Sequence, residues 1–233
     1  MSKIIAIIPA RGGSKGIPRK NIVPFNNKPL LAHSIIHGLS SDLIDRVIVS
    51  TEDKEIAEIS NNYGAEVILR PNELAGDQVL DWPVFDSVLN ELSKNNYFPD
   101  LIIHLRPTSP YRKIEWIDEC IKKLSDNKKA DSIRSVSVPI SHPYRIFDID
   151  KNGFLEPIMK HKHPEPYLLR RQDLPDLYYY NCVIDVAKYD TIKNKKSMTG
   201  NRILPYIMDC NDVIDIDTKR DLLIAKTLYK LDK

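Results

Sequence analysis

This chain has few cysteines, a small net charge and no long apolar run, and each of these features excludes a class of protein. The three cysteines, Cys120, Cys182 and Cys210, lack CxxC spacing. We therefore expect reduced thiols in a cytoplasmic protein, not a disulfide framework or a zinc site. The net charge of +2 creates no overall field that would attract nucleic acid or a membrane surface. No apolar run reaches the length of a membrane span, and we expect no signal peptide.

The first apolar run ends abruptly in a loop that is rich in glycine and positive charge. Residues 4–8 predict a buried parallel strand, and the loop that follows contains Arg11, Ser14, Lys15 and Lys20. Open α/β sheets bind ligands at the carboxyl ends of their strands, and glycine lets backbone N–H groups approach an anion closely. The order Gly-Gly-Ser-Lys-Gly differs from a Walker A loop and from the dinucleotide fingerprint. We predict a polyphosphate-binding loop; the alternative is a tight surface turn with solvated lysines.

Strand-like and helix-like patterns alternate along the chain. This alternation predicts an α/β fold with a doubly wound, mostly parallel sheet, and 233 residues suit a single domain, 1–233. Asp53 and Asp81 are expected to cap two of the helices. The expected strands are residues 3–9, 45–50, 65–69, 100–105, 131–138 and 178–186, and the expected helices cover 29–37, 53–64, a stretch from 81 onward and 114–125.

The segment from about 139 to 175 interrupts this alternation with crowded prolines and histidines. Gly153 lies in a predicted hairpin turn at residues 150–153. We interpret the segment as a projecting arm that serves as a lid, a dimerisation element or both; the alternative is a plain surface excursion. His161 and His163 are interpreted as exposed loop residues because the sequence offers no obvious third metal ligand.

Two carboxylates, Asp215 and Asp217, stand just before the last predicted helix. At a spacing of i, i+2 on an extended segment they point to the same side, and oxygen ligands of this kind suit Mg²⁺. The alternative is that Asp217 or Thr218 caps the helix together with Asp221. A neighbouring phosphate loop favours the metal interpretation.

Arginines follow several of the other predicted strands. Arg106 follows residues 100–105 and is itself followed by two hydroxyl residues, while Arg70 precedes a turn of small residues that suits a base edge. Arg170 and Arg171 offer two guanidiniums that can grip a carboxylate or phosphate. Because strand ends converge at one edge of a parallel sheet, we expect these groups to lie near the phosphate loop.

Six motifs together resemble the cytidylyltransferases that activate acidic sugars, and most closely the group that acts on N-acylneuraminate (sialic acid) and legionaminate. They are ARGGSKGIPRKN, VIVSTEDKEIA, GAEVILRPNELAGD, RPTSPYR, RRQDLP and DIDTKRD, in family order along the chain. The resemblance implies a nucleotide-diphospho-sugar-transferase-like fold of the Rossmann type. It also implies CMP transfer from CTP to the sugar acid with release of pyrophosphate, dependence on Mg²⁺, and a homodimer in which the arm completes a neighbour's site.

The resemblance also implies roles for individual residues. The triphosphate would contact Arg11, Ser14, Lys15 and Lys20, and the nucleotide would contact Asn21, Arg70, Ala75 and Gly76. The sugar acid would contact Arg106, Thr108, Ser109, Arg171, Gln172 and Asn181, and Mg²⁺ would be bound by Asp215 and Asp217. Arg11, Lys20 and Asp217 would be the catalytic groups.

Arg106 departs from the family pattern, in which glutamine usually precedes Pro-Thr-Ser-Pro. A guanidinium cannot accept a hydrogen bond and adds positive charge. The residues therefore leave open another anionic acceptor, such as an octulosonate or a phosphorylated sugar. A non-catalytic nucleotide-binding protein is a third interpretation, against which the cationic loop and the carboxylate pair argue.

Overall fold

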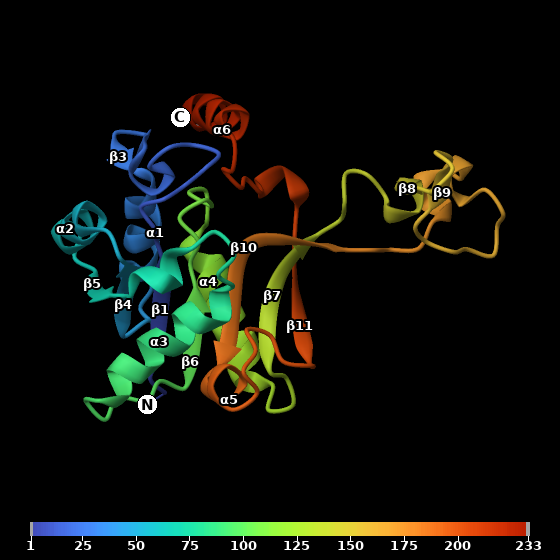
Figure 1. Ribbon diagram of the computed structural model, residues 1–233. Coiled ribbons are helices and arrows are strands. Elements are labelled where there is room, and N and C mark those ends of the chain that lie inside the picture. The colour runs from blue at the N-terminus through green and yellow to red at the C-terminus, as the bar shows by residue number, and fades with distance from the viewer. Residues whose placement is uncertain (1, 232–233) are drawn as a thin grey trace.

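Seven strands form the central sheet in the computed structural model, which describes residues 2–231 (Figure 1). The strand order is β11-β7-β10-β6-β1-β4-β5. Strand β10 runs antiparallel to both of its neighbours, and the other neighbouring pairs are parallel. The predicted α/β fold with a mostly parallel sheet is confirmed. The strands are β1 (Ile4–Pro9), β4 (Arg46–Thr51), β5 (Glu66–Leu69), β6 (Leu101–His104), β7 (Ser132–Ser137), β10 (Tyr179–Lys188) and β11 (Ile203–Met208).

Helices cover both faces of the sheet. Successive side chains of β1 point to opposite faces, so Ile4 and Ile8 pack in the core beneath α1, α2 and α4, whereas Ile5 and Ile7 pack in the core beneath α3 and α5. Burial on both faces explains why β1 is apolar throughout. The helices are α1 (Leu30–Leu39), α2 (Lys54–Asn62), α3 (Asp81–Ser93), α4 (Ile114–Asp126), α5 (Tyr189–Lys193) and α6 (Lys219–Leu231).

The helix starts agree with the sequence in one case and differ in another. Asp53 caps α2 as predicted, because its carboxylate accepts a hydrogen bond from Ile56 N at 3.0 Å. The prediction that Asp81 caps α3 is wrong: Leu80 is the N-cap, and Asp81 is the first helical residue. The Asp81 carboxylate accepts a hydrogen bond from Arg106 instead.

Strand β11 is not predicted by the sequence pattern. Its exposed and half-buried residues alternate because successive side chains point to opposite faces of the sheet, and Pro205 interrupts the apolar run on this edge strand. Proline is tolerated on an edge strand, since one side of that strand has no ladder to complete. The strand forms because β11 pairs in parallel with β7, a long-range interaction that no local sequence pattern predicts.

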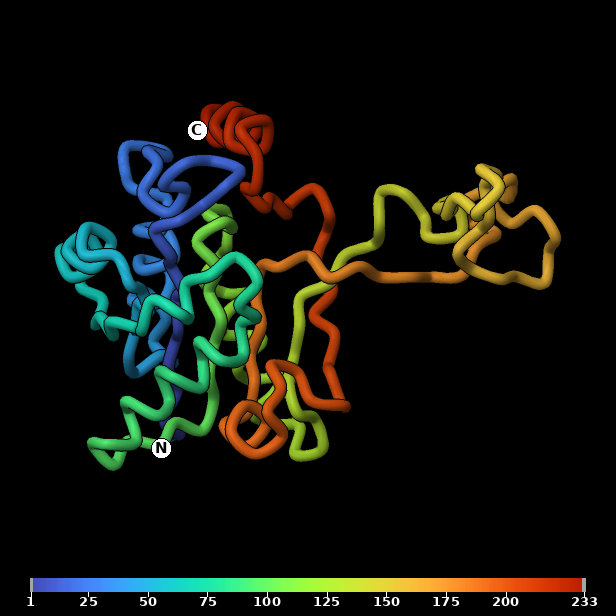
Figure 2. Tube along the Cα trace, viewed as in Figure 1, coloured from blue at the N-terminus to red at the C-terminus, as the bar shows by residue number. Residues whose placement is uncertain are grey.

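The predicted arm projects from the sheet between β7 and β10 (Figures 1 and 2). At its far end lies the hairpin of β8 (Phe147–Ile149) and β9 (Leu155–Pro157). Its predicted turn is confirmed: Gly153 has φ +86° and its N–H donates to the carbonyl of Asp150 at 2.9 Å. Large apolar side chains are exposed along the arm, including those of Phe154 and Leu155.

The segment before α6 is attached to the rest of the domain through Ile216. This side chain is buried in a small core with Phe25, Leu30 and Ala225. The Ile216 N–H also donates to the carbonyl of Thr108 at 2.9 Å. Both anchors fix the flanking carboxylates beside the loop that follows β6. Among residues 2–231, every helix is too short or too polar to cross a membrane.

Candidate active site

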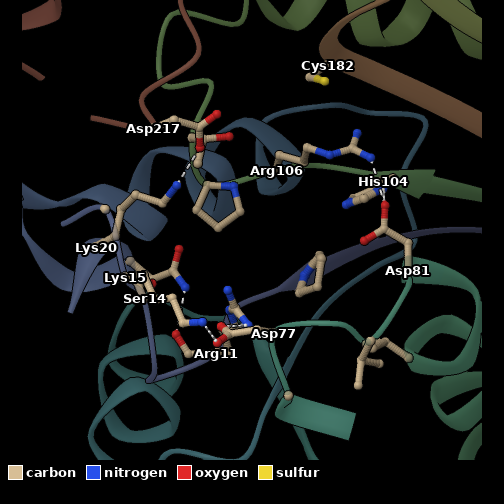
Figure 3. A pocket seen from close by; sticks show the side chains of 18 of the residues that line it. Arg11, Ser14, Lys15, Lys20, Asp77, Asp81, His104, Arg106, Cys182 and Asp217 are labelled. Atoms are coloured by element: carbon tan, nitrogen blue, oxygen red, sulfur yellow. Dashed lines mark hydrogen bonds and ion pairs between the residues drawn. The ribbon is translucent and has the colours of Figure 1, made fainter. Parts of the chain in front are cut away.

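A cavity of about 540 Å³ opens where β1, β5 and β6 end (Figure 3). The chain passes from β1 to β4 on one side and reaches β6 on the other, so the strand order reverses beside β1. Ligands of open α/β sheets bind at such a reversal. The predicted site residues that line this cavity are Arg11, Ser14, Lys15, Lys20, Asn21, Arg70, Gly76, Arg106, Thr108, Asp215 and Asp217.

The cationic loop after β1 forms one side of the cavity. Arg11 Nη1 lies 2.8 Å from Asp77 Oδ1, and Lys15 Nζ lies 2.5 Å from Asp77 Oδ2. The hydrogen bond from Lys15 and the charge of Arg11 hold the pKa of Asp77 below its usual value. Figure 3 shows these side chains meeting at the cavity edge beside Ser14. The two cations are thus gathered where an incoming anion can exchange with Asp77.

Close packing, not only flexibility, explains two glycines in this loop. A Cβ on Gly16 would lie 2.5 Å from the carbonyl oxygen of Asp217, and a Cβ on Gly12 would clash with Asp53. Arg19 turns away from the cavity and pairs with Asp53, which also caps α2. The loop is therefore pressed between the start of α2 and the segment before α6.

Arg70 and Asn21 also line the cavity, and both are buried. Asn21 donates to the carbonyl of Arg11 at 2.9 Å, which fixes the end of the loop. Arg70 donates to Glu52 through two nitrogens. Gly76 also lines the cavity, in the turn after β5.

The carboxylate pair and the helix cap are separate features. Thr218 and Asp221 make a reciprocal capping box: Asp221 N donates to Thr218 Oγ1 at 3.2 Å, and Thr218 N donates to Asp221 Oδ2 at 2.7 Å. The predicted alternative that Thr218 caps α6 is therefore confirmed. Asp217 accepts a hydrogen bond from Lys20 Nζ at 2.7 Å and faces the cavity together with Asp215.

Asp215 has the properties of a cation ligand. Its Oδ1 atom is buried and has no hydrogen-bond partner among residues 2–231. Burial raises the pKa of Asp215, and a hydrogen bond from Thr108 only partly offsets this effect. A buried carboxylate oxygen without a donor is stabilised by a cation. Within the described chain no group of three or more His, Cys, Asp or Glu residues could hold a metal ion. Two carboxylates suit Mg²⁺, which proteins commonly hold through one or two carboxylates together with substrate phosphates.

Arg106 lines the cavity but is already paired with two carboxylates. Its Nη1 lies 2.7 Å from Asp185 Oδ2 and its Nη2 lies 2.9 Å from Asp81 Oδ2. Arg134 also pairs with Asp185 at 2.9 Å, and the Tyr180 hydroxyl donates to the same carboxylate. Burial lowers the pKa of Arg106, but the attraction of Asp185 outweighs it, and the guanidinium stays charged. The two arginines and the two aspartates together carry no net charge.

His104 lies beneath this ion-pair cluster at the end of β6. Its ring packs on Phe85 with centroids 4.7 Å apart, and neither ring nitrogen has a hydrogen-bond partner among the described residues. Burial, together with the charges of Arg106, Arg112 and Arg134, holds the pKa of His104 well below its usual value. The imidazole is therefore neutral at physiological pH.

Five of the predicted site residues lie outside the cavity. Ala75 belongs to the turn beside Gly76. Ser109 is buried and donates to a backbone carbonyl, and Asn181 is buried with its amide bonded to two serines of β7. Arg171 and Gln172 belong to the arm.

Four acidic residues and one histidine at the site were missed by sequence reasoning. Glu52 and Asp77 belong to motifs that resemble the family's, but their carboxylates carry no signal of their own. Asp81 is misassigned as a helix cap. His104 and Asp185 lie on strands, where a lone polar residue is hard to distinguish from an exposed one.

Comparisons with known proteins show which family this chain belongs to. Residues 5–199 match the cytidylyltransferase family model. The N-acylneuraminate cytidylyltransferase of Escherichia coli is 32% identical over 98% of this chain and 52% of its own length. The CMP-N,N'-diacetyllegionaminic acid synthase of Legionella pneumophila is 33% identical over 99% of this chain and 98% of its own length.

The fold also matches solved structures. The CMP:2-keto-3-deoxy-manno-octonic acid synthetase complexed with CTP superposes with a TM-score of 0.75, covering 100% of each chain at 16% identity. An identity this low establishes a shared fold alone. The chain spans about half the length of the Escherichia coli relative and nearly the whole of the Legionella relative.

Proposed function

This chain belongs to the cytidylyltransferase family, and we propose that it transfers CMP from CTP to a nonulosonic acid with release of pyrophosphate. The observation that carries the proposal is a single cavity in which a cationic loop, a carboxylate pair and the small-residue turn after β5 converge. The relatives are named for N-acylneuraminate and for N,N'-diacetyllegionaminic acid, which are acidic sugars of this class.

In this mechanism the acceptor hydroxyl attacks the α-phosphorus of CTP and pyrophosphate leaves. Negative charge grows on the phosphoryl oxygens, and Arg11, Lys15 and Lys20 stabilise it from one side of the cavity. These cations are held by Asp77 and Asp217 before the nucleotide binds, so binding exchanges carboxylates for phosphates.

Asp215 and Asp217 fit a divalent cation, and we infer that they bind Mg²⁺. The buried Oδ1 of Asp215, which has no donor within the described chain, supports this assignment. Mg²⁺ would neutralise charge on the triphosphate and on the developing transition state. Lys20 then remains free to move from Asp217 to a phosphate oxygen.

A more anionic acceptor is the second candidate, because Arg106 lines the cavity. The ion pairs of Arg106 with Asp81 and Asp185 weaken that candidate, since its charge is already balanced. A nonulosonic acid, with its single carboxylate, is therefore preferred over a phosphorylated sugar.

We further propose a homodimer in the cytoplasm. The exposed apolar side chains of the arm, such as Phe154 and Leu155, would be covered by a second copy of the chain. Arg171 and Gln172 of the arm would then reach the acceptor in the partner's cavity. The three cysteines are free thiols, which suits a reducing compartment.

Pyrophosphate release with a panel of acceptors tests the proposed function. We expect release with CTP and Mg²⁺ plus N-acetylneuraminate or a legionaminate, and little release when ATP or GTP replaces CTP. Turnover only with a phosphorylated sugar would overturn the acceptor class. Binding of CTP without turnover of any acidic sugar would support a non-catalytic protein.

A further inference from the structure

One half-buried carboxylate, that of Glu52, connects the cationic loop to Arg70, the arginine that follows β5. Glu52 follows β4 and contributes one oxygen to each side. Its Oε1 accepts a hydrogen bond from Gly12 N at 2.7 Å. Its Oε2 accepts from Arg70 Nε at 3.1 Å and from Arg70 Nη2 at 3.0 Å. The loop after β1 and the loop after β5 thus share a single anchor.

The anchor fixes the guanidinium of Arg70 in one orientation. With Nε and Nη2 both on Glu52, Nη1 has no hydrogen-bond partner among residues 2–231, and Arg70 lines the cavity. The Arg70 side chain is only 3% exposed. Its backbone N–H donates to the carbonyl of Thr51 at 2.9 Å, so the main chain is held as well. A guanidinium held in this way offers its remaining donors in a fixed direction.

The loop side of the anchor is equally constrained. The N–H of Gly12 is used by Glu52 and is not available to a phosphate. The absence of a side chain lets Gly12 lie against Asp53, which in turn pairs with Arg19 of the same loop. Glu52 and Asp53 therefore hold the loop at Gly12 and at Arg19, and of the two acids only Glu52 also contacts Arg70.

We propose that Glu52 is a positioning residue for nucleotide recognition, acting through Arg70 and Gly12. The proposal rests on the proposed function in taking CTP as the donor. Arginine donors match the O2 and N3 acceptors of cytosine, whereas N3 of uracil carries a hydrogen. If Glu52 fixes the direction of the Arg70 donors, it controls discrimination between CTP and UTP without touching either nucleotide.

The geometry requires a carboxylate at this position. A glutamine side chain offers only one acceptor oxygen, so Glu52→Gln cannot satisfy Gly12 and Arg70 together and aims an N–H group at one of these donors. Glu52→Asp keeps the charge but is shorter by one methylene, so it can reach only one of the two partners at hydrogen-bond distance.

The test compares CTP with UTP by calorimetric binding in the presence of Mg²⁺ and by steady-state kinetics. For Glu52→Gln we expect the KM and Kd for CTP to rise by about tenfold, the loss of one charge-assisted hydrogen bond. The values for UTP should rise less, so the CTP/UTP preference should fall, with kcat changing less than KM. Glu52→Asp should lie between the wild type and Glu52→Gln.

The matched control is Glu66→Gln. Glu66 also makes a bidentate pair with an arginine, Arg46, but on the exposed edge strand β5, away from the cavity. This variant should keep the CTP/UTP preference of the wild type. An equal loss of affinity for both nucleotides in Glu52→Gln, or an unchanged preference, would overturn the positioning role.

The outcomes separate this inference from the proposed function. Binding preference is measured without an acceptor, so a protein that prefers CTP but transfers it to no acidic sugar would contradict only the proposed reaction. A wild type that binds UTP as tightly as CTP would contradict the cytidine assignment itself, and with it this role for Glu52.

Discussion

At the residue scale, the acidic residues of the segment 215–221 have different roles, although they are close in sequence. Asp221 caps α6 with Thr218, whereas Asp217 contacts Lys20 and faces the cavity. Burial of Ile216 turns Asp215 and Asp217 together toward the cavity, because adjacent residues of an extended segment point to opposite sides. The sequence shows the acids but not which of them the helix uses.

Asp217→Asn should reduce transfer without affecting the fold. An amide is a poor ligand for Mg²⁺, so kcat should fall by about 10²–10³, as when one electrostatic stabiliser is removed. The Asp217 side chain is 67% exposed, so the free energy of unfolding should change by less than about 0.5 kcal/mol. Turnover and urea unfolding are measured on the same preparation.

Asp221→Asn is the matched control for Asp217→Asn. It weakens the capping box and should lower stability, by about 1 kcal/mol at most, while leaving the cavity carboxylates in place. Near-normal turnover of Asp217→Asn at ordinary Mg²⁺ would refute the metal role. A large loss of stability in that variant would assign Asp217 to the fold instead.

Arg106→Gln should destabilise the protein and impair use of the acceptor. Removing the guanidinium leaves Asp185, which is only 4% exposed, with one arginine, Arg134, and the hydroxyl of Tyr180. We expect the free energy of unfolding to fall by about 1–3 kcal/mol, which is typical of a buried charge that loses a partner. The double variant Arg106→Gln/Asp185→Asn should recover part of this loss, because the carboxylate is then neutral.

Kinetics distinguish a contact with the acceptor from a purely structural role of Arg106. The sequence predicts that Arg106 touches the acceptor, so KM for the sugar acid should rise while the Kd for CTP stays the same. Equal effects on both substrates would assign Arg106 to support of the loop, and a defect confined to CTP would contradict both roles.

At the scale of elements, α1 and β6 each bury histidines that are held neutral. Burial lowers the pKa of His33 on α1 and of His104 on β6, and it lowers that of His37 on α1 to about 3. In the unfolded chain these residues titrate near 6.5. The unfolded state therefore binds more protons below that pH, and stability, fully present above about pH 7, is lost as the pH falls through 6.5.

The stability of the protein should therefore fall between pH 6.5 and 5, by about 1.4 kcal/mol per pH unit for each histidine that stays neutral. Lys195 lowers the pKa of Asp131 to about 2, so Asp131 contributes to the pH dependence of stability only at lower pH. His104 faces Asp81 and Asp185 at 3.8 and 3.9 Å, and Arg106 and Arg134 beyond them. The arginines and burial outweigh these acids.

His104→Leu tests this pH dependence. The variant removes two buried nitrogens that have no partner among the described residues. The unfolded state then binds up to one proton fewer, so the slope of the unfolding free energy against pH should become shallower by up to about 1.4 kcal/mol per pH unit. His163→Gln, a change at an exposed residue of the arm, is the control and should leave the slope as it is. An unchanged slope in His104→Leu would mean that this imidazole is charged in the folded protein.

Predictability from sequence differs between elements for physical reasons. Strands such as β1, buried on both faces, and the cap at Asp53 are predicted because local residues determine them. Strand β11 is not, because its order comes from pairing with β7. Asp81 is misassigned because its carboxylate is taken by Arg106, a partner 25 residues away that no local pattern reveals.

At the scale of the whole molecule, the order of the strands brings the loops of the candidate site together, whereas the arm lies outside the site. Loops after β1, β5 and β6 meet because those strands are parallel and lie on either side of the reversal. The arm departs beside β10, and its Arg171 and Gln172 lie outside the cavity of the same chain (Figure 2). Their predicted contact with the acceptor therefore requires a second copy of the chain.

Mixing two inactive variants tests this arrangement. Arg171→Ala removes the guanidinium of the arm, and Asp217→Asn removes the carboxylate of the cavity. In a mixed dimer, one site combines both defects and the other combines the intact Asp217 of one chain with the intact Arg171 of its partner. Random exchange of subunits should therefore restore about one quarter of the wild-type rate. No recovery, although exchange is demonstrated by differently tagged chains, would show that the arm does not complete a neighbouring site. A wild type that sediments as a monomer at the assay concentration would contradict the dimer itself.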